Sequence, residues 1–427
     1  MTQLRITNGR VIDPSQSLDQ VADLWIRGER ILGIGPQPGL VADRTIDAAG
    51  MIVSPGLIDM HVHLREPGRE EDETVATGSA AAVAGGITSV ACMPNTDPPL
   101  DHQAAAEFIH LQARRAGNAH VFPIGCVTKG RQGAELAEIG GLVEGGAVAF
   151  SDDDVPIVSA EIMRRALEYC RMFDKPVLSH AEDLELTKGG LMHEGRESMR
   201  LGLRGMPAAA EEVMIYRDIE LARLTGGRLH FLHVSTAGSV ELIRRAKNDG
   251  VRVTAETCPQ YFFLTDQELR RFDSNHKLNP PLRTQDDVQA LIAGLKDGTL
   301  DVLASDHSPQ APEKKLRELD QAPFGIVGLE TLLPISIKAL LEPGHLTWPQ
   351  LIEKLTIRPA SILDIKRGTL KPEVYADVTI IDPAAEWTID VSKFASKSRN
   401  SPFDGVKVRG RAHAVIVRGG VKYEQIR

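Results

Sequence analysis

The stretch that decides the fold is GLIDMHVH, residues 56–63, a short apolar run that ends in two histidines separated by one residue. Seven further apolar runs follow it, each ending in polar residues: TSVACMPN (88–95), HVFPIGCV (120–127), AVAFSDDD (147–154), PVLSHAED (176–183), LHFLHVS (229–235), VRVTAETCP (251–259) and VLASDHSP (302–309). Amphipathic segments with helix-capping residues lie between them. Continuous apolar strands that alternate with helices predict a parallel sheet buried on both faces. Eight such units favour an α/β fold, a (β/α)₈ TIM-type barrel over residues 56–367.

An open doubly wound sheet is the alternative architecture for this alternation. That fold often carries a glycine-rich phosphate loop after its first strand. The chain contains neither a G-x-G-x-x-G nor a G-x-x-x-x-G-K-[ST] motif. The barrel is therefore the preferred prediction.

The two ends of the chain have a different pattern. Residues 1–55 and 368–427 hold short strands punctuated by glycine and proline turns. Each end is too short to bury a core of its own. We therefore predict one small β-sandwich domain that is built from both termini.

Composition limits the class of protein. The chain has 427 residues and a formal net charge of −9, which disfavours a dedicated nucleic-acid binder because no basic field faces the phosphates. No apolar run reaches the ~18 residues of a membrane span, and the N-terminus lacks the apolar centre of a signal peptide. These features predict a cytoplasmic protein with no membrane partner.

Histidines and aspartates cluster at the ends of the predicted strands. In a (β/α)₈ barrel the carboxyl ends of all strands meet at one mouth, where active sites form. Alternation along a strand places His61 and His63 on one face. The polar residues at the ends of the other predicted strands include His180, His233, Asp306 and one aspartate of the run 152–154. Four imidazoles with two carboxylates form a ligand set that suits zinc, and isolated core histidines are the weaker interpretation.

Several further motifs stand out along the chain: GLIDMHVHLREPG (56–68), MPNT (93–96), HAED (180–183), HVS (233–235), TCPQYFFLT (257–265), NPPLR (279–283) and SDHSP (305–309). Together they resemble the dihydroorotases of the amidohydrolase superfamily, in their class I bacterial form. The resemblance spans nearly the whole chain, and HLREPG is its most specific part. It implies a cyclic amide hydrolase that converts N-carbamoyl-L-aspartate and L-dihydroorotate reversibly, in pyrimidine (UMP) biosynthesis.

The resemblance also implies roles for individual residues. One or two zinc ions would be held by His61, His63, Asp153, His180, His233 and Asp306, with Asp306 also the catalytic base and acid. Substrate binding would fall to His63, Leu64, Arg65, Asn95, Asn279, Gln310, Phe324 and Gly325. Arg65 suits a substrate carboxylate because guanidinium binds carboxylate in a bidentate manner. The alternative interpretation is that Arg65 is a surface residue paired with Glu66 or Glu70.

One position departs from the family pattern. Gln310 stands where these enzymes usually have a histidine, and Gln cannot carry charge. Two alternatives therefore stay open: a related cyclic amidase acting on allantoin or a hydantoin, and a non-catalytic partner of aspartate transcarbamoylase. The resemblance also implies a homodimer and a possible complex with that transcarbamoylase.

Overall fold

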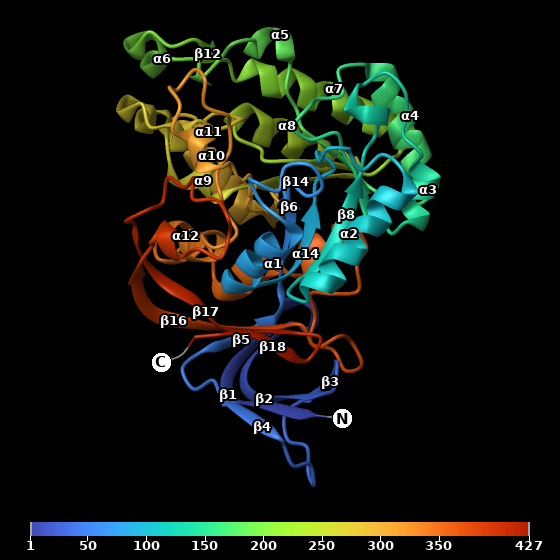
Figure 1. Cartoon of the computed structure of the whole chain (residues 1–427), viewed down its shortest axis with the longest axis vertical. Coiled ribbons are helices and arrows are strands. Elements are labelled where there is room, and N and C mark those ends of the chain that lie inside the picture. The colour runs from blue at the N-terminus through green and yellow to red at the C-terminus, as the bar shows by residue number, and fades with distance from the viewer. Residues whose placement is uncertain (1, 426–427) are drawn as a thin grey trace.

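The structure is a computed structural model that describes residues 2–425. Figure 1 shows two parts stacked along the long axis. A large part of strands and surrounding helices lies above, and a smaller all-β part that contains both ends of the chain lies below. The predicted fold class, a TIM-type barrel with a β domain from both termini, is confirmed.

The barrel sheet consists of eight strands, one at each of the eight apolar runs found in the sequence. They are β6 (Leu57–Val62), β7 (Ile87–Cys92), β8 (His120–Gly125), β9 (Ala149–Phe150), β10 (Val177–Ser179), β13 (Leu229–Phe231), β14 (Val253–Thr257) and β15 (Val302–Leu303). Neighbours in this order are hydrogen-bonded and parallel. The circle closes where Val62 bridges His307 in parallel and the His63 N–H donates to the His307 carbonyl at 2.8 Å.

Helices surround the sheet. They are α1 (Val75–Ala84), α2 (Gln103–Ala116), α3 (Ile139–Glu144), α4 (Ala160–Arg171), α7 (Ala209–Thr225), α8 (Ala237–Asn248), α10 (Gln285–Asp297), α13 (Trp348–Leu355) and α14 (Ile357–Leu363). Local sequence sets their ends. Thr284 caps α10 in a reciprocal pair with Asp287, and α2 ends at Gly117, whose φ of 66° suits glycine.

Shorter elements form the loops over the barrel mouth and the flank of the barrel. They are α5 (Leu184–Thr187), β11 (Met192–His193), α6 (Arg196–Leu201), β12 (Gly205–Met206), α9 (Pro259–Phe263), α11 (Pro312–Lys315) and α12 (Leu332–Ser336). The segment 308–325 after β15, rich in Pro, Lys and Glu, contains α11 and is otherwise irregular.

The β domain joins the two ends of the chain in one mixed sheet. Its strands are β1 (Gln3–Asp13), β2 (Leu18–Arg27), β3 (Arg30–Ile34), β4 (Arg44–Asp47), β5 (Ile52–Pro55), β16 (Val378–Thr388), β17 (Lys407–Val417) and β18 (Gly420–Glu424). The connection is the antiparallel pair β5–β16, in which Val53 lies opposite Ile380. Apolar side chains from both ends share one buried core, so neither end completes the domain alone.

The buried apolar side chains of the barrel form two clusters, a large one and a smaller one that includes Met60, Ile124 and Leu178. All four cysteines are buried and free. Within residues 2–425 no helix is both long and apolar enough to cross a bilayer.

Candidate metal centre and substrate cavity

The six side chains predicted as metal ligands lie together at the carboxyl ends of the barrel strands. His61 belongs to β6 and His63 follows it, while the other four follow β9, β10, β13 and β15 within three residues. All six are buried. Because parallel strands present their carboxyl ends at one edge, the fold brings together residues that are far apart in the sequence.

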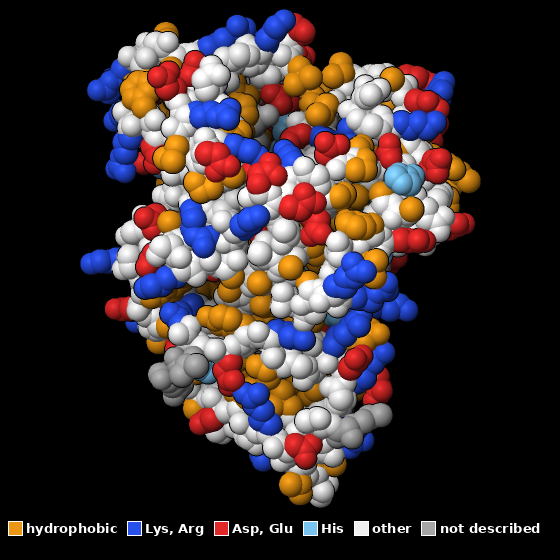
Figure 2. Space-filling model, viewed as in Figure 1, with side chains coloured by type: hydrophobic (Ala, Val, Ile, Leu, Met, Phe, Trp, Pro, Cys, Tyr) orange, Lys and Arg blue, Asp and Glu red, His pale blue; other side chains and the backbone are white. Residues whose placement is uncertain are grey.

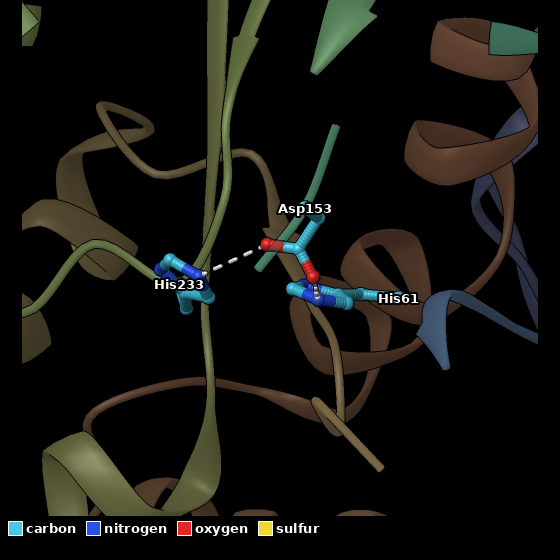
Figure 3. A group of neighbouring side chains, drawn as sticks. All are labelled: His61, Asp153 and His233. Atoms are coloured by element: carbon cyan, nitrogen blue, oxygen red, sulfur yellow. Dashed lines mark hydrogen bonds and ion pairs between the residues drawn. The ribbon is translucent and has the colours of Figure 1, made fainter. Parts of the chain in front are cut away.

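Asp153 lies at the centre of the cluster. Its Oδ2 is 3.2 Å from His61 Nε2 and 3.5 Å from His63 Nε2. Its Oδ1 is 3.2 Å from His180 Nδ1 and 3.6 Å from His233 Nε2. Figure 3 shows the carboxylate between His61 and His233, with one oxygen directed toward each ring.

Asp306 approaches the same cluster from the opposite strand of the barrel. Its Oδ1 lies 3.6 Å from His61 Nε2 and 3.5 Å from His63 Nε2. Two groups of three could therefore hold a cation, with their ligand atoms within 4.8 Å of one another: His61, Asp153 and His233, and His61, His63 and Asp306.

Buried polar partners fix the orientation of three of the rings. His61 Nδ1 lies 2.6 Å from Glu256 Oε1, so Nε2 is the nitrogen that faces Asp153. His180 Nε2 lies 2.9 Å from Glu182 Oε2, which leaves its Nδ1 toward the cluster. The amide oxygen of Asn95 is 2.9 Å from His63 Nδ1. Such partners set which nitrogen of an imidazole is available to a metal.

The electrostatics of the cluster keep Asp153 and Glu256 ionised. Burial raises the pKa of Asp153, but the neighbouring His61, His180 and His233 outweigh it and hold the pKa well below its usual range. Burial likewise raises the pKa of Glu256, yet the charge of His61 lowers it to about 2. These buried anions require positive charge beside them, either protonated imidazoles or a metal ion.

The donor set fits a divalent cation. Asp153 Oδ1 is buried and receives no hydrogen bond, although two imidazole nitrogens lie within 3.6 Å of it. His180 Nδ1 and His233 Nε2 are only 2.8 Å apart, so both ring nitrogens are directed into the same space. Imidazole nitrogens and carboxylate oxygens around one point are the ligands that zinc and related ions take.

A cavity of about 760 Å³ opens beside the cluster. Five cationic side chains line it: Arg65, Arg69, Lys188, Lys277 and Lys314. Five carboxylates balance them: Asp153, Asp154, Glu182, Asp306 and Asp320. The net charge of −9 therefore does not describe the barrel mouth, where a bound metal ion would leave an excess of positive charge for an anionic ligand.

Arg65 lies deep in this cavity and is only 2% exposed, so it is not a surface residue paired with a glutamate. Its Nη2 donates to Ser308 Oγ at 2.6 Å and its Nε to the Pro309 carbonyl at 3.2 Å. Nη1 is buried and has no hydrogen-bond partner among the described residues. Burial lowers the pKa of Arg65 to about 10, so the guanidinium stays charged at neutral pH.

Five of the other predicted substrate residues line the same cavity as Arg65: His63, Asn279, Gln310, Phe324 and Gly325. Asn279 Nδ2 donates to Glu182 Oε2 at 2.9 Å, and Gln310 Nε2 donates to the Phe324 carbonyl at 3.0 Å. Gln310 thus stabilises the loop that carries Phe324.

Leu64 and Asn95 do not line the cavity. The Leu64 side chain is packed in the apolar core beside Gly78. Asn95 is buried, with its amide held between His63 and Asp154.

Sequence reasoning missed Glu256, Glu182, Arg69 and Lys277. The HAED motif held a signal for Glu182, because it follows His180 by two residues and alternation can return it to the same side. Glu256 had no such signal, since its partner His61 is 195 residues away.

Comparison with solved structures defines the class of protein. L-Hydantoinase (dihydropyrimidinase) from Arthrobacter aurescens matches with a TM-score of 0.87 and 28% identity, covering 100% of this chain and 97% of that chain. Dihydropyrimidinase from Brevibacillus agri matches with a TM-score of 0.85 and 26% identity, covering 99% and 95%. The chain is a cyclic amide hydrolase of the amidohydrolase type.

Sequence comparison defines the family. A model described as "Dihydro-orotase-like" matches residues 50–239. Curated dihydroorotases from Pelobacter propionicus and Geobacter metallireducens are each 52% identical over 425 residues, which is 99% of this chain and 100% of each relative. The chain belongs to the dihydroorotase family. Both this family and the hydantoinases are metal-dependent, in keeping with the cluster of histidines and aspartates.

Proposed function

We propose that the chain interconverts N-carbamoyl-L-aspartate and L-dihydroorotate in pyrimidine biosynthesis, as a class I bacterial dihydroorotase. One observation carries this choice of substrate. The buried Arg65 has a guanidinium N–H without a protein partner in a cavity that also borders His63, Asp153 and Asp306. An unpaired buried donor of this kind is costly unless a ligand satisfies it, and a carboxylate matches it in charge and shape.

The metal in this proposal is zinc, as one or two ions. His61, His63, Asp153, His180, His233 and Asp306 would hold it. When bound, it would polarise the ring carbonyl and lower the pKa of water near neutrality. Glu256 and Glu182 orient the imidazoles through Nδ1 of His61 and Nε2 of His180.

The proton in this proposal is moved by Asp306. Its carboxylate borders the cavity and the cluster at once. It accepts a proton from the attacking water during hydrolysis and returns it to the leaving ring nitrogen. During cyclisation the same carboxylate accepts the proton from the carbamoyl nitrogen, as microscopic reversibility requires.

The substrate is oriented by residues on opposite sides of the cavity. Arg65 binds the exocyclic carboxylate, and its guanidinium is held by Ser308. Asn95 acts indirectly, because its amide oxygen holds the His63 ring. Asn279 and the Phe324–Gly325 segment contact the ring, and Gln310 holds that segment through the Phe324 carbonyl. Leu64 contributes through its backbone, because its side chain is in the core.

The alternative of a hydantoinase-like enzyme is supported by the solved structures that match this fold. A turnover assay separates the two, with dihydroorotate, hydantoin and allantoin offered to the same metal-loaded sample. Preference for dihydroorotate, and its selective loss in Arg65→Met, supports the proposal. Turnover of hydantoin without turnover of dihydroorotate would overturn it.

A non-catalytic role beside aspartate transcarbamoylase is disfavoured because all six proposed ligands are present and close together. The proposed setting is a cytoplasmic homodimer, with an optional transcarbamoylase complex. Mass measurement of the purified chain, alone and with the transcarbamoylase, tests both assemblies.

A further inference from the structure

A second cavity, of about 450 Å³, lies where the barrel meets the β domain. It is bordered by α2, the first residues of β8 and the β17–β18 turn. Because β8 begins there, the cavity is at the opposite end of the barrel from the metal centre. None of its lining residues lines the substrate cavity.

Basic side chains dominate the lining. Four are cationic, Arg114, Arg367, Arg418 and Lys422, and two histidines, His110 and His120, lie beside them, whereas Glu29 is the one acidic residue in the lining. Figure 2 shows Lys and Arg side chains gathered on this flank, between α2 and the β domain. In a chain whose formal net charge is −9, this excess of positive charge is local and concave.

The protein itself neutralises little of this charge. The buried Asp377 lies 2.9 Å from Arg367 Nε and 3.0 Å from His120 Nε2, so this carboxylate is shared between Arg367 and an imidazole. Within residues 2–425, Arg114, Arg418 and Lys422 form no ion pair.

Three guanidinium groups also crowd a single aromatic ring. Arg30, Arg367 and Arg418 lie 3.9, 4.3 and 5.3 Å from the centroid of Tyr375. The ring stabilises cations through its π face. It does not remove their mutual repulsion, which a bound anion would relieve.

Apolar side chains form part of the remaining wall, beside the polar Asn118. Val121 and Val417 are buried there, and Phe122 is half-buried. The volume exceeds what a bare phosphate needs, so the cavity has room for an organic group against Phe122. A phosphate monoester carries up to two negative charges and three free acceptor oxygens. It can therefore bind several separate cations at once, which a single carboxylate cannot do.

We propose that this cavity is a binding site for a phosphate monoester whose organic part is apolar or aromatic. The phosphate is bound by Arg114, Arg418 and Lys422, and the organic group packs on Phe122. Because Arg114 belongs to the barrel and Arg418 to the β domain, the ligand bridges the two parts of the chain.

Calorimetric titration of the metal-loaded full chain with phenyl phosphate and with inorganic phosphate, at constant ionic strength, tests the site. The wild type should bind one phenyl phosphate saturably and more tightly than inorganic phosphate. The double variant Arg114→Ser/Arg418→Ser should bind phenyl phosphate about tenfold or more weakly, because two charge-assisted contacts are lost. Arg115→Ser is the matched control, since Arg115 lies on the same helix outside the cavity and should leave binding unchanged.

Dihydroorotate turnover of each variant verifies that it is folded and should equal that of the wild type. The single variant Lys422→Ser, at an exposed position, repeats the test if the double variant fails to fold. Unchanged phenyl phosphate affinity in these variants would overturn the site. Affinity for phenyl phosphate no greater than for inorganic phosphate would overturn the proposed ligand class.

Discussion

Glu256 offers the sharpest test of how the metal centre is held. The carboxylate is fully buried, and its Oε1 lies 2.6 Å from His61 Nδ1. Its Oε2 lies 3.3 Å from His230 Nε2. Glu256→Gln keeps the shape and removes the charge, so the His61 ring loses the anion that orients it and raises its basicity.

The magnitude follows from the kind of hydrogen bond. A bond to a charged group contributes about 1.5–3 kcal/mol and a neutral one about 0.5–1.5 kcal/mol, so the substitution costs roughly 1–1.5 kcal/mol. That corresponds to about a tenfold loss of metal affinity, at the lower end of the roughly 10–100-fold typical for such partners.

Competition with a calibrated zinc chelator measures the affinity, and dihydroorotate turnover at saturating metal measures the remaining activity. Glu342→Gln is the control, because this glutamate is exposed and forms no ion pair within residues 2–425. Wild-type metal affinity in Glu256→Gln would refute the view that this carboxylate orients His61.

Three further substitutions test the proton transfer, the Gln310 contact and the buried Lys315. Asp306→Asn should lower kcat by roughly 10²–10⁴-fold, as loss of a general base does, while the metal content by elemental analysis changes little; full turnover would remove Asp306 from the proton transfer. Gln310→His should leave kcat/KM for dihydroorotate unchanged or raised; a large fall would show that the hydrogen bond from Gln310 to the Phe324 carbonyl is itself required. For Lys315, burial followed by the nearby Lys277 lowers the pKa to about 7. The unfolded chain then binds more protons than the folded one above about pH 7, so this group makes stability rise with pH up to about 10.5. Urea unfolding at about pH 6.5 and about pH 8.5 should show a smaller rise in Lys315→Met than in the wild type; an equal rise would contradict the shifted pKa.

The barrel was predictable because its strands are buried on both faces. Each of the eight apolar runs quoted from the sequence coincides with one strand of the barrel sheet, and only β7 begins outside its run, one residue earlier at Ile87. The joining of both termini was predictable because neither end could bury a core alone, and the β5–β16 pair confirms it. The division of the chain at residues 55/56 and 367/368 stays a prediction.

The site was less predictable, because side-chain direction depends on backbone beyond the strands. Continuing the alternation of His61 and His63 predicts Arg65 at the mouth, yet β6 ends at Val62 and Arg65 has a φ of 62°. Its position comes instead from the hydrogen bonds to Ser308 and Pro309.

The run 152–154 shows the same limit. The strand β9 covers only Ala149–Phe150, so alternation could not choose among the aspartates. Tertiary contacts separate them: Asp152 accepts from the N–H groups of Val127 and Thr128, Asp154 pairs with Arg131, and Asp153 enters the cluster.

We propose that the chain is a metal-dependent hydrolase that selects a ring with an exocyclic carboxylate. The most direct measurement is kcat/KM for dihydroorotate and for hydantoin on one sample of known metal content, before and after removal of the metal by a chelator. We expect a strong preference for dihydroorotate over hydantoin. Turnover of dihydroorotate should disappear with the metal and return when zinc is restored. Equal or greater turnover of hydantoin, or full turnover of dihydroorotate without metal, would contradict it.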